Sequence, residues 1–162
     1  MKIARFIYNN KEEWGTLNNN KINIIKGNIF EEYTITDQQV DINNVKLLAP
    51  CQPTKGVCVG LNYQNHAKEM NEELPKEPLI FIKPSAAVNN PNDEIKYPSI
   101  SKNVHYEAEL GVVIKKKAYK VSKEDANDYI LGYTCANDVT ARDLQNRMDS
   151  GLEENHLIHL CQ

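Results

Sequence analysis

His105-Tyr-Glu-Ala-Glu-Leu-Gly-Val-Val-Ile114 joins two carboxylates to a run of apolar and β-branched residues. The run from Leu110 to Ile114 predicts a strand that enters a hydrophobic core. Because side chains two positions apart on a strand share a face, Glu107 and Glu109 are expected to point in the same direction. The segment therefore predicts a pair of neighbouring carboxylates at the point where an apolar strand begins.

Two neighbouring carboxylates repel each other, and each is costly to bury without a partner. A hard divalent cation removes both costs, because Mg²⁺, Mn²⁺ and Ca²⁺ prefer carboxylate oxygens. Asp138 supplies a third carboxylate, directly after a second strand-like run over residues 129–136. The alternative is that Glu107 and Glu109 lie on the solvated face of an edge strand, because exposed carboxylates are the rule.

The composition is that of a soluble globular protein. The chain has 162 residues, of which 41% are hydrophobic and 25% charged, with a net charge of −3. A chain without a strongly basic surface is not expected to bind nucleic acid. It has no apolar run of the roughly 20 residues that span a bilayer and no signal-peptide pattern, so no membrane partner is expected.

The four cysteines form no Cys-x-x-Cys pair, so a zinc site is not expected. Cys58 and Cys135 lie in apolar, strand-like runs and are predicted to be small core residues. Together with the lack of a signal peptide, these features predict a protein of the reducing cytoplasm.

The pattern divides the chain into two expected units. Residues 1–45 alternate short strand patterns with asparagine-rich turns, which predicts a small antiparallel β domain. Residues 46–146 form the second unit, with strands expected at 56–60 and 79–82 in addition to the two described above. Helices are expected from Tyr63 to about Glu73 and from Ser122 to about Tyr129, with Asn62 and Ser122 as their caps.

The first of these helices carries a second chemical pair, His66 and Glu69. Residues three apart are neighbours on a helix face, so the carboxylate can orient the imidazole. An imidazole held in this way is a common general base and can deprotonate a water molecule. The alternative from the spacing alone is an exposed His–Glu pair that contributes little.

Four motifs, in this order, give the chain a close resemblance to the fumarylacetoacetate hydrolase family in its small bacterial form. They are Val59-Gly-Leu-Asn-Tyr-Gln-Asn-His-Ala-Lys-Glu69, Phe81-Ile-Lys-Pro-Ser85, His105-Tyr-Glu-Ala-Glu-Leu110 and Gly132-Tyr-Thr-Cys-Ala-Asn-Asp-Val-Thr-Ala-Arg-Asp-Leu-Gln145. The resemblance extends over residues 1 to about 146. It implies a mainly β fold with few helices (α+β), namely a mixed β-sandwich roll that is incomplete at the C-terminus and carries a small N-terminal β unit. It also implies a homodimer.

The resemblance implies an enzyme that hydrolyses or decarboxylates small β-diketo or α-keto acids, of the acylpyruvate, fumarylacetoacetate or oxaloacetate type, through an enolate. The alternative within enzymes is an isomerase of unsaturated dicarboxylates such as 2-hydroxyhepta-2,4-diene-1,7-dioate. By the same resemblance a metal ion, Mg²⁺ or else Mn²⁺ or Ca²⁺, stabilises the enolate as a Lewis acid.

The resemblance also assigns roles to eight residues. Glu107, Glu109 and Asp138 would hold the metal ion. His66 and Glu69 would activate water on a mobile lid helix. Arg142 and Gln145 would bind the substrate carboxylate, and Lys83 would either hold anionic groups of the site or be structural.

The last residues depart from the family pattern. Family members continue with a segment like Gly-Gln-Trp-Thr-Arg-x-Lys-Ser-Phe-Asp-Thr-Phe, and the codons of Met148 onward can encode that segment in another reading frame. We therefore expect residues 147–162 to be a frame-shifted tail, so that His156 and His159 form no metal site. A catalytically inactive fragment that lacks the family's lysine is accordingly the third functional alternative.

Overall fold

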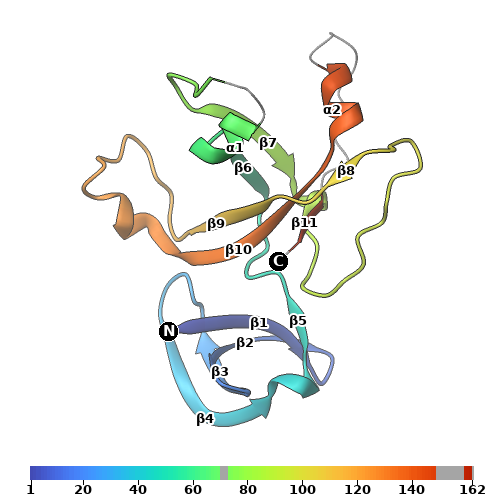
Figure 1. The fold of residues 1–162 in the computed structure, drawn as a ribbon. Helices are drawn as coiled ribbons and strands as arrows, with labels where there is room; N and C mark the ends of the chain where they lie inside the picture. Colours follow the sequence, from blue (N-terminus) through green and yellow to red (C-terminus); the bar gives the residue numbers. More distant parts are fainter. Residues whose placement is uncertain (70–72, 149–158, 162) are drawn as a thin grey trace.

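The structure is a computed structural model that describes residues 1–69, 73–148 and 159–161. The N-terminal part is a five-stranded antiparallel sheet in the order β4-β3-β2-β1-β5 (Figure 1). Its strands are β1 (Lys2–Tyr8), β2 (Lys11–Asn18), β3 (Lys21–Gly27), β4 (Tyr33–Asp41) and β5 (Lys46–Leu48).

Asparagine residues form the tight turns of this sheet, as the sequence predicts. Asn9 and Asn10 connect β1 to β2, with φ angles of 48° and 60°, and Asn19 lies between β2 and β3 with φ of 51°. Asparagine adopts this left-handed conformation more readily than most residues, which favours two-residue hairpin loops. The hairpins bring Phe6 and Ile22, both fully buried, into one core.

Arg5 is the main buried charge of the N-terminal sheet. Its Nε and Nη2 donate to the two carboxylate oxygens of Glu12 at 2.7 Å each, and its Nη1 donates to the carbonyl of Ala49 at 3.1 Å. The hydrogen bonds from Arg5 lower the pKa of Glu12. Arg5 therefore links Ala49, which follows the last strand of this sheet, to Glu12 within the sheet.

Gly27, at the end of β3, has a conformation that side chains disfavour. Its φ is +104°, and a Cβ atom added there would lie 2.5 Å from the carbonyl oxygen of Glu32. We expect Gly27→Ala to lower the free energy of unfolding by about 1–3 kcal/mol, since it combines backbone strain with a backbone clash. Urea unfolding followed by circular dichroism would measure this, with Gly132→Ala, which meets no atom within 4 Å, as the control. Equal stability of the two variants would contradict the prediction.

The second part contains two further groups of strands. The hairpin partners β6 (Lys55–Gly60) and β7 (Leu79–Pro84) are antiparallel, and α1 (Gln64–Glu69) lies in the connection between them. The other group is built on β10 (Ile130–Ala141), which pairs with β8 (Val104–His105), β9 (Ala108–Ile114) and β11 (His159–Cys161). α2 (Arg142–Met148) follows β10 directly. Within the described residues, no helix is long and apolar enough to cross a membrane.

Three one-turn 3-10 helices complete the described structure, at Ile42–Asn44, Ser85–Ala87 and Ala126–Tyr129. The last of these replaces the helix that the sequence predicts from Ser122 to Tyr129. Ser122 does accept a hydrogen bond from the Asp125 N–H at 3.1 Å, but only a turn follows. Asn127 and Asp128 are poor helix formers, and this explains the difference.

The other predicted helix is described in part. α1 is described from Gln64 to Glu69, and residues 70–72, over which the prediction continues, lie outside the described residues. β10 is longer than predicted, so Asp138 lies inside this strand and not after its end. Glu107 lies in a short break between β8 and β9, whereas the sequence placed it within a continuous strand.

The two faces of the β9–β10 pair differ strongly. Leu110, Val112 and Ile114 of β9 are exposed, while Glu109, Gly111 and Val113, which alternate with them, are half-buried. Cys135 lies opposite Leu110 on the exposed face, so its prediction as a core residue is wrong, whereas Cys58 is half-buried. The β-rich architecture predicted from the sequence is confirmed. The apolar residues of β9, however, are half-buried on one face of the strand and exposed on the other.

A loop connects the two parts through side-chain contacts. The side-chain oxygen of Asn90 accepts a hydrogen bond from the Ala49 N–H at 3.1 Å, and Asp93 forms an ion pair with Lys46 at 2.8 Å. Farther along the same loop, Ser101 Oγ donates to Asp143 of α2 at 2.6 Å. The loop thus touches the N-terminal sheet at one end and α2 at the other.

Candidate active site

Of the three predicted metal ligands, Glu109 lies on β9, Asp138 lies on β10, and Glu107 lies in the break directly before β9. The Asp138 N–H donates to the Glu107 carbonyl at 2.8 Å, and the Glu107 N–H donates to the side-chain oxygen of Asn137 at 3.0 Å. Glu109 lies opposite Ala136 in the ladder between β9 and β10. These two hydrogen bonds hold the backbone of Glu107 against β10. The side chain of Asn137, a residue that the sequence analysis missed, accepts one of them.

Asp138 forms a buried ion pair with Lys83, which reaches it from β7. The Lys83 side chain is fully buried and that of Asp138 is 9% exposed. Burial lowers the pKa of Lys83 to about 8, while Cys58 and Glu109 act in the opposite direction. The adjacent Asp138 carboxylate also favours the charged ammonium, because opposite charges in contact stabilise each other. The structure thus brings Lys83 to the predicted acidic cluster.

Arg142, at the start of α2, forms an ion pair with Glu107. Its Nη1 also donates to Gln145 Oε1 at 2.8 Å, so the two residues predicted to bind a substrate carboxylate lie together. The Arg142 Nε is buried and makes no hydrogen bond to the described residues. A guanidinium presents several N–H donors in a planar fork and is therefore suited to bind a carboxylate.

Asp143 fixes the start of α2 and was not singled out by the sequence analysis. Its carboxylate accepts hydrogen bonds from Ser101 Oγ at 2.6 Å and from the Lys102 N–H at 2.9 Å. These hydrogen bonds lower the pKa of Asp143. The Arg142 N–H donates to the Asn103 carbonyl at 2.8 Å, so the same loop also holds the backbone of the arginine.

The donor set fits a hard divalent cation by its chemistry, because it consists of three carboxylates. Among the described residues, no group of three or more histidine, cysteine, aspartate or glutamate side chains is arranged to hold a metal ion. Asp138 and Glu107 instead contact Lys83 and Arg142, which supply positive charge. The three-carboxylate metal site therefore stays a prediction.

His66 and Glu69 both belong to α1, as the sequence predicts. Ala67, between them, is buried and attaches this short helix to the rest of the protein. The exposed Glu69 is described, but the side chain of His66 lies outside the described residues. Their action as a water-activating dyad stays a prediction.

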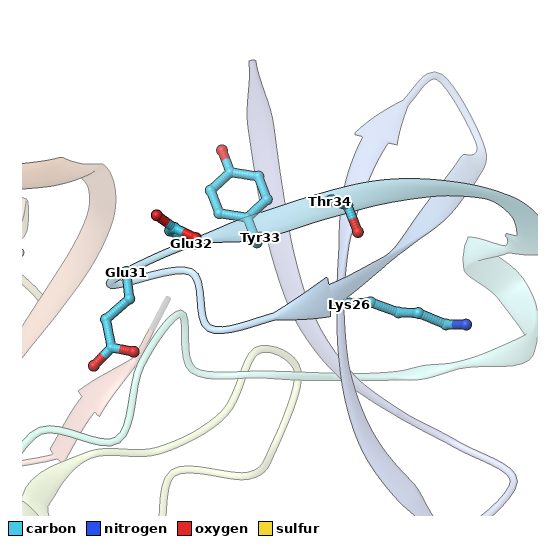
Figure 2. Close-up of a pocket in the computed structure, with 5 residues that line it drawn as sticks. All are labelled: Lys26, Glu31, Glu32, Tyr33 and Thr34. Carbon is cyan, nitrogen blue, oxygen red and sulfur yellow. The ribbon is translucent and has the colours of Figure 1, made fainter.

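Two hollows in the described surface contain none of the predicted site residues. Figure 2 shows the larger one, of about 550 Å³, at the end of the β3–β4 hairpin, where Lys26 of β3 and Tyr33 and Thr34 of β4 line it together with Glu31 and Glu32. The smaller one, of about 260 Å³, has a mainly apolar lining that includes Tyr97, Val104 and Val139. The charged cluster, and not either hollow, is therefore the candidate site.

The structure is a β-rich scaffold in which Asp138 contacts Lys83 and Glu107 contacts Arg142. Residues 55–160 match the family model described as "Fumarylacetoacetate (FAA) hydrolase C-terminal", and residues 1–50 match "Rv2993c-like, N-terminal". The chain belongs to the fumarylacetoacetate hydrolase family.

Similar proteins support this membership over different lengths. An uncharacterized protein of Methanocaldococcus jannaschii is 49% identical over 124 residues, which cover 72% of this chain and 52% of that protein. The mitochondrial oxaloacetate tautomerase fahd2 of Xenopus laevis is 47% identical over 104 residues, or 64% of this chain and 33% of the tautomerase.

Solved structures extend the similarity to nearly the whole chain. The 2-hydroxyhepta-2,4-diene-1,7-dioate isomerase of Mycobacterium marinum is 30% identical with a TM-score of 0.82, and the match covers 99% of this chain and 64% of the isomerase. The chain spans about half the length of curated relatives that it matches.

Proposed function

We propose that a protein containing this chain acts on small α-keto or β-diketo acids by stabilising an enolate. The observation that carries the proposal is the cluster of Glu107 and Asp138 with Arg142 and Lys83, beside the half-buried Glu109. Such a cluster offers cationic groups for a substrate carboxylate and acidic groups for a metal ion. The family includes enzymes, among them the oxaloacetate tautomerase and the isomerase described above.

The roles follow from the chemistry of each group. Glu107, Glu109 and Asp138 would hold Mg²⁺, or Mn²⁺ or Ca²⁺ in its place. When bound, the metal ion supplies positive charge near the oxygens of the keto acid. Lys83 holds the buried Asp138 in a fixed position, because its ammonium contacts that carboxylate. Arg142 and Gln145 would bind the substrate carboxylate through hydrogen bonds.

Tautomerisation or double-bond isomerisation is the reaction that the relatives favour by their names. It requires only proton transfers to and from the enolate, so an acid or base near the substrate is sufficient. Hydrolysis or decarboxylation of a carbon–carbon bond is the second candidate. Hydrolysis is supported by the placement of His66 and Glu69 on one formed helix, since cleavage by water needs a base to activate that water.

Binding of oxalate, a stable dianion shaped like the enolate of a keto acid, tests the site directly. We expect calorimetry to detect oxalate binding in the presence of Mg²⁺. We expect Arg142→Gln to weaken it by about 10-fold or more, because a charge-assisted hydrogen bond is lost. Lys120→Gln, outside the cluster, is the control. Absence of oxalate binding with and without Mg²⁺, or equal binding by the Arg142 variant, would contradict the proposed site.

The rates at which the protein converts oxaloacetate and acylpyruvate then distinguish tautomerisation from hydrolysis. Ultraviolet absorbance of the oxaloacetate enol reports tautomerisation, and loss of acylpyruvate absorbance reports hydrolysis. If oxalate binds but neither substrate reacts faster than in buffer with Mg²⁺, the chain binds ligands without catalysis, as the fragment alternative predicts.

A further inference from the structure

Three consecutive residues of the loop before β8 form hydrogen bonds at the start of α2 (Figure 1). Ser101 Oγ and the Lys102 N–H donate to the two carboxylate oxygens of Asp143, at 2.6 Å and 2.9 Å. The Asn103 carbonyl accepts the Arg142 N–H at 2.8 Å, and the Asn103 N–H donates to Ser101 Oγ at 3.2 Å. We call these four hydrogen bonds the Asp143 network.

The Asp143 network is well placed to fix the helix. Ser101 is only 4% exposed, so water has little access to its hydroxyl group. A hydrogen bond to an ionised carboxylate is also roughly twice as strong as one between neutral groups. The Arg142 N–H belongs to the first turn of α2, where backbone N–H groups have no partner within the helix. The network therefore determines where α2 begins and in which direction it leaves β10.

The helix start held in this way carries the two residues proposed to bind the substrate carboxylate. Arg142 and Gln145 are three positions apart on α2, and Arg142 Nη1 donates to Gln145 Oε1 at 2.8 Å. Of the predicted metal ligands, Glu109 and Asp138 lie instead on β9 and β10. A shift of the helix start would therefore move the carboxylate-binding groups relative to these metal ligands.

We infer that Asp143 and Ser101 are positioning residues for Arg142, and that the affinity of the site for a substrate carboxylate depends on them. The inference rests on the proposed function, in which Arg142 binds that carboxylate. A binding group that is in place before the ligand arrives binds it more tightly, because affinity falls in proportion to the fraction of molecules in the competent arrangement. A network that only stabilised the fold would have no such effect.

Calorimetric titration with oxalate in the presence of Mg²⁺ tests the inference. We expect Ser101→Ala and Asp143→Asn each to weaken oxalate binding by about 3- to 10-fold, because each removes or weakens a charge-assisted hydrogen bond and Arg142 is then in place for only part of the time. The double variant should bind oxalate about as weakly as either single variant, since both substitutions act on one network. The affinity for Mg²⁺ alone should be unchanged, because none of the predicted metal ligands takes part in the network.

Ser122→Ala is the matched control. Ser122 Oγ donates to Asp125 at 2.8 Å, so this substitution removes the same kind of serine–aspartate hydrogen bond from an exposed turn. It should leave both affinities unchanged. Asp143→Asn serves alone should Ser101→Ala alter the circular dichroism spectrum of the chain.

A second measurement needs no ligand. The chain contains three arginines, so nitrogen relaxation of their side-chain Nε–H groups can follow Arg142 separately by nuclear magnetic resonance. We expect the Nε–H of Arg142 to become more mobile in both network variants. Arg5, whose Nε donates to Glu12 at 2.7 Å, is the internal reference and should not change.

The outcomes separate this inference from the proposed function. If Arg142→Gln weakens oxalate binding and neither network variant does, the inference is wrong and the proposed function stands. The inference is also wrong if the affinities for oxalate and Mg²⁺ fall together, or if the Arg142 Nε–H is as rigid in both variants as in the wild type. If the wild type binds no oxalate, the proposed function fails and the inference fails with it.

Discussion

Replacing Asp138 by alanine should lower the free energy of unfolding by about 3–5 kcal/mol, the effect of removing one partner from a buried ion pair. Lys83 is fully buried and contacts the Asp138 carboxylate. Without that carboxylate its ammonium either stays charged in a poorly solvated position or loses its proton, and both outcomes destabilise the folded chain. Urea unfolding at neutral pH, monitored by circular dichroism, would measure the change.

A double-mutant cycle provides the control for this first prediction. Lys83→Met places an apolar side chain of similar length beside Asp138, and the double variant removes both charges. We expect the double variant to be more stable than Asp138→Ala alone, because no unpaired buried charge remains. If Asp138→Ala costs less than about 1 kcal/mol, or if the two substitutions are additive, then the ion pair does not hold β7 against β10.

The second large effect is expected at Glu109. Loss of a residue that supports a metal ligand typically lowers metal affinity by about 10–100-fold. Glu109→Gln changes a ligand itself, so it should lower the affinity of the chain for Mg²⁺ by more than that. The reason is that an amide carries no charge, and three carboxylates are expected to share the cation. Calorimetric titration with MgCl₂ would measure the affinity without requiring any catalytic activity.

Glu124→Gln is the matched control, because it makes the same chemical change at an exposed carboxylate that is not one of the predicted metal ligands. It should leave the Mg²⁺ affinity unchanged. Equal affinities of the wild type and the Glu109 variant would remove Glu109 from the metal site and leave it as a neighbour of Lys83.

The hairpins of the N-terminal sheet follow from local sequence. The asparagine pairs predict tight turns, and the turns determine which strands are neighbours. Local sequence was less informative at residues 122–129, where a good capping residue precedes poor helix formers and only a 3-10 turn results. The full length of β10 also escaped prediction, because pairing with β8 and β11 extends it past Ala136.

The candidate site was predicted by residue type and not by its contacts. The strand pattern singled out the three acids, and the resemblance to a family added Arg142 and Gln145. It left the partner of Lys83 open, because Lys83 and Asp138 are 55 positions apart and meet only after two groups of strands have packed. Asp143 and Ser101 are 42 positions apart and escaped notice for the same reason.

The loop from Asn90 to Ser101 has a consequence for how the family can vary. It contacts the N-terminal sheet near Ala49 and Lys46 and then fastens the helix that begins with Arg142. The two family models meet in this chain between residues 50 and 55, so residues 1–50, the N-terminal module, and the second part match separate family descriptions. If another module replaced the N-terminal module in evolution, the position of Arg142 would be kept only if the new module formed equivalent contacts with the loop. Residues 90–93 are therefore where compensating substitutions between modules should accumulate.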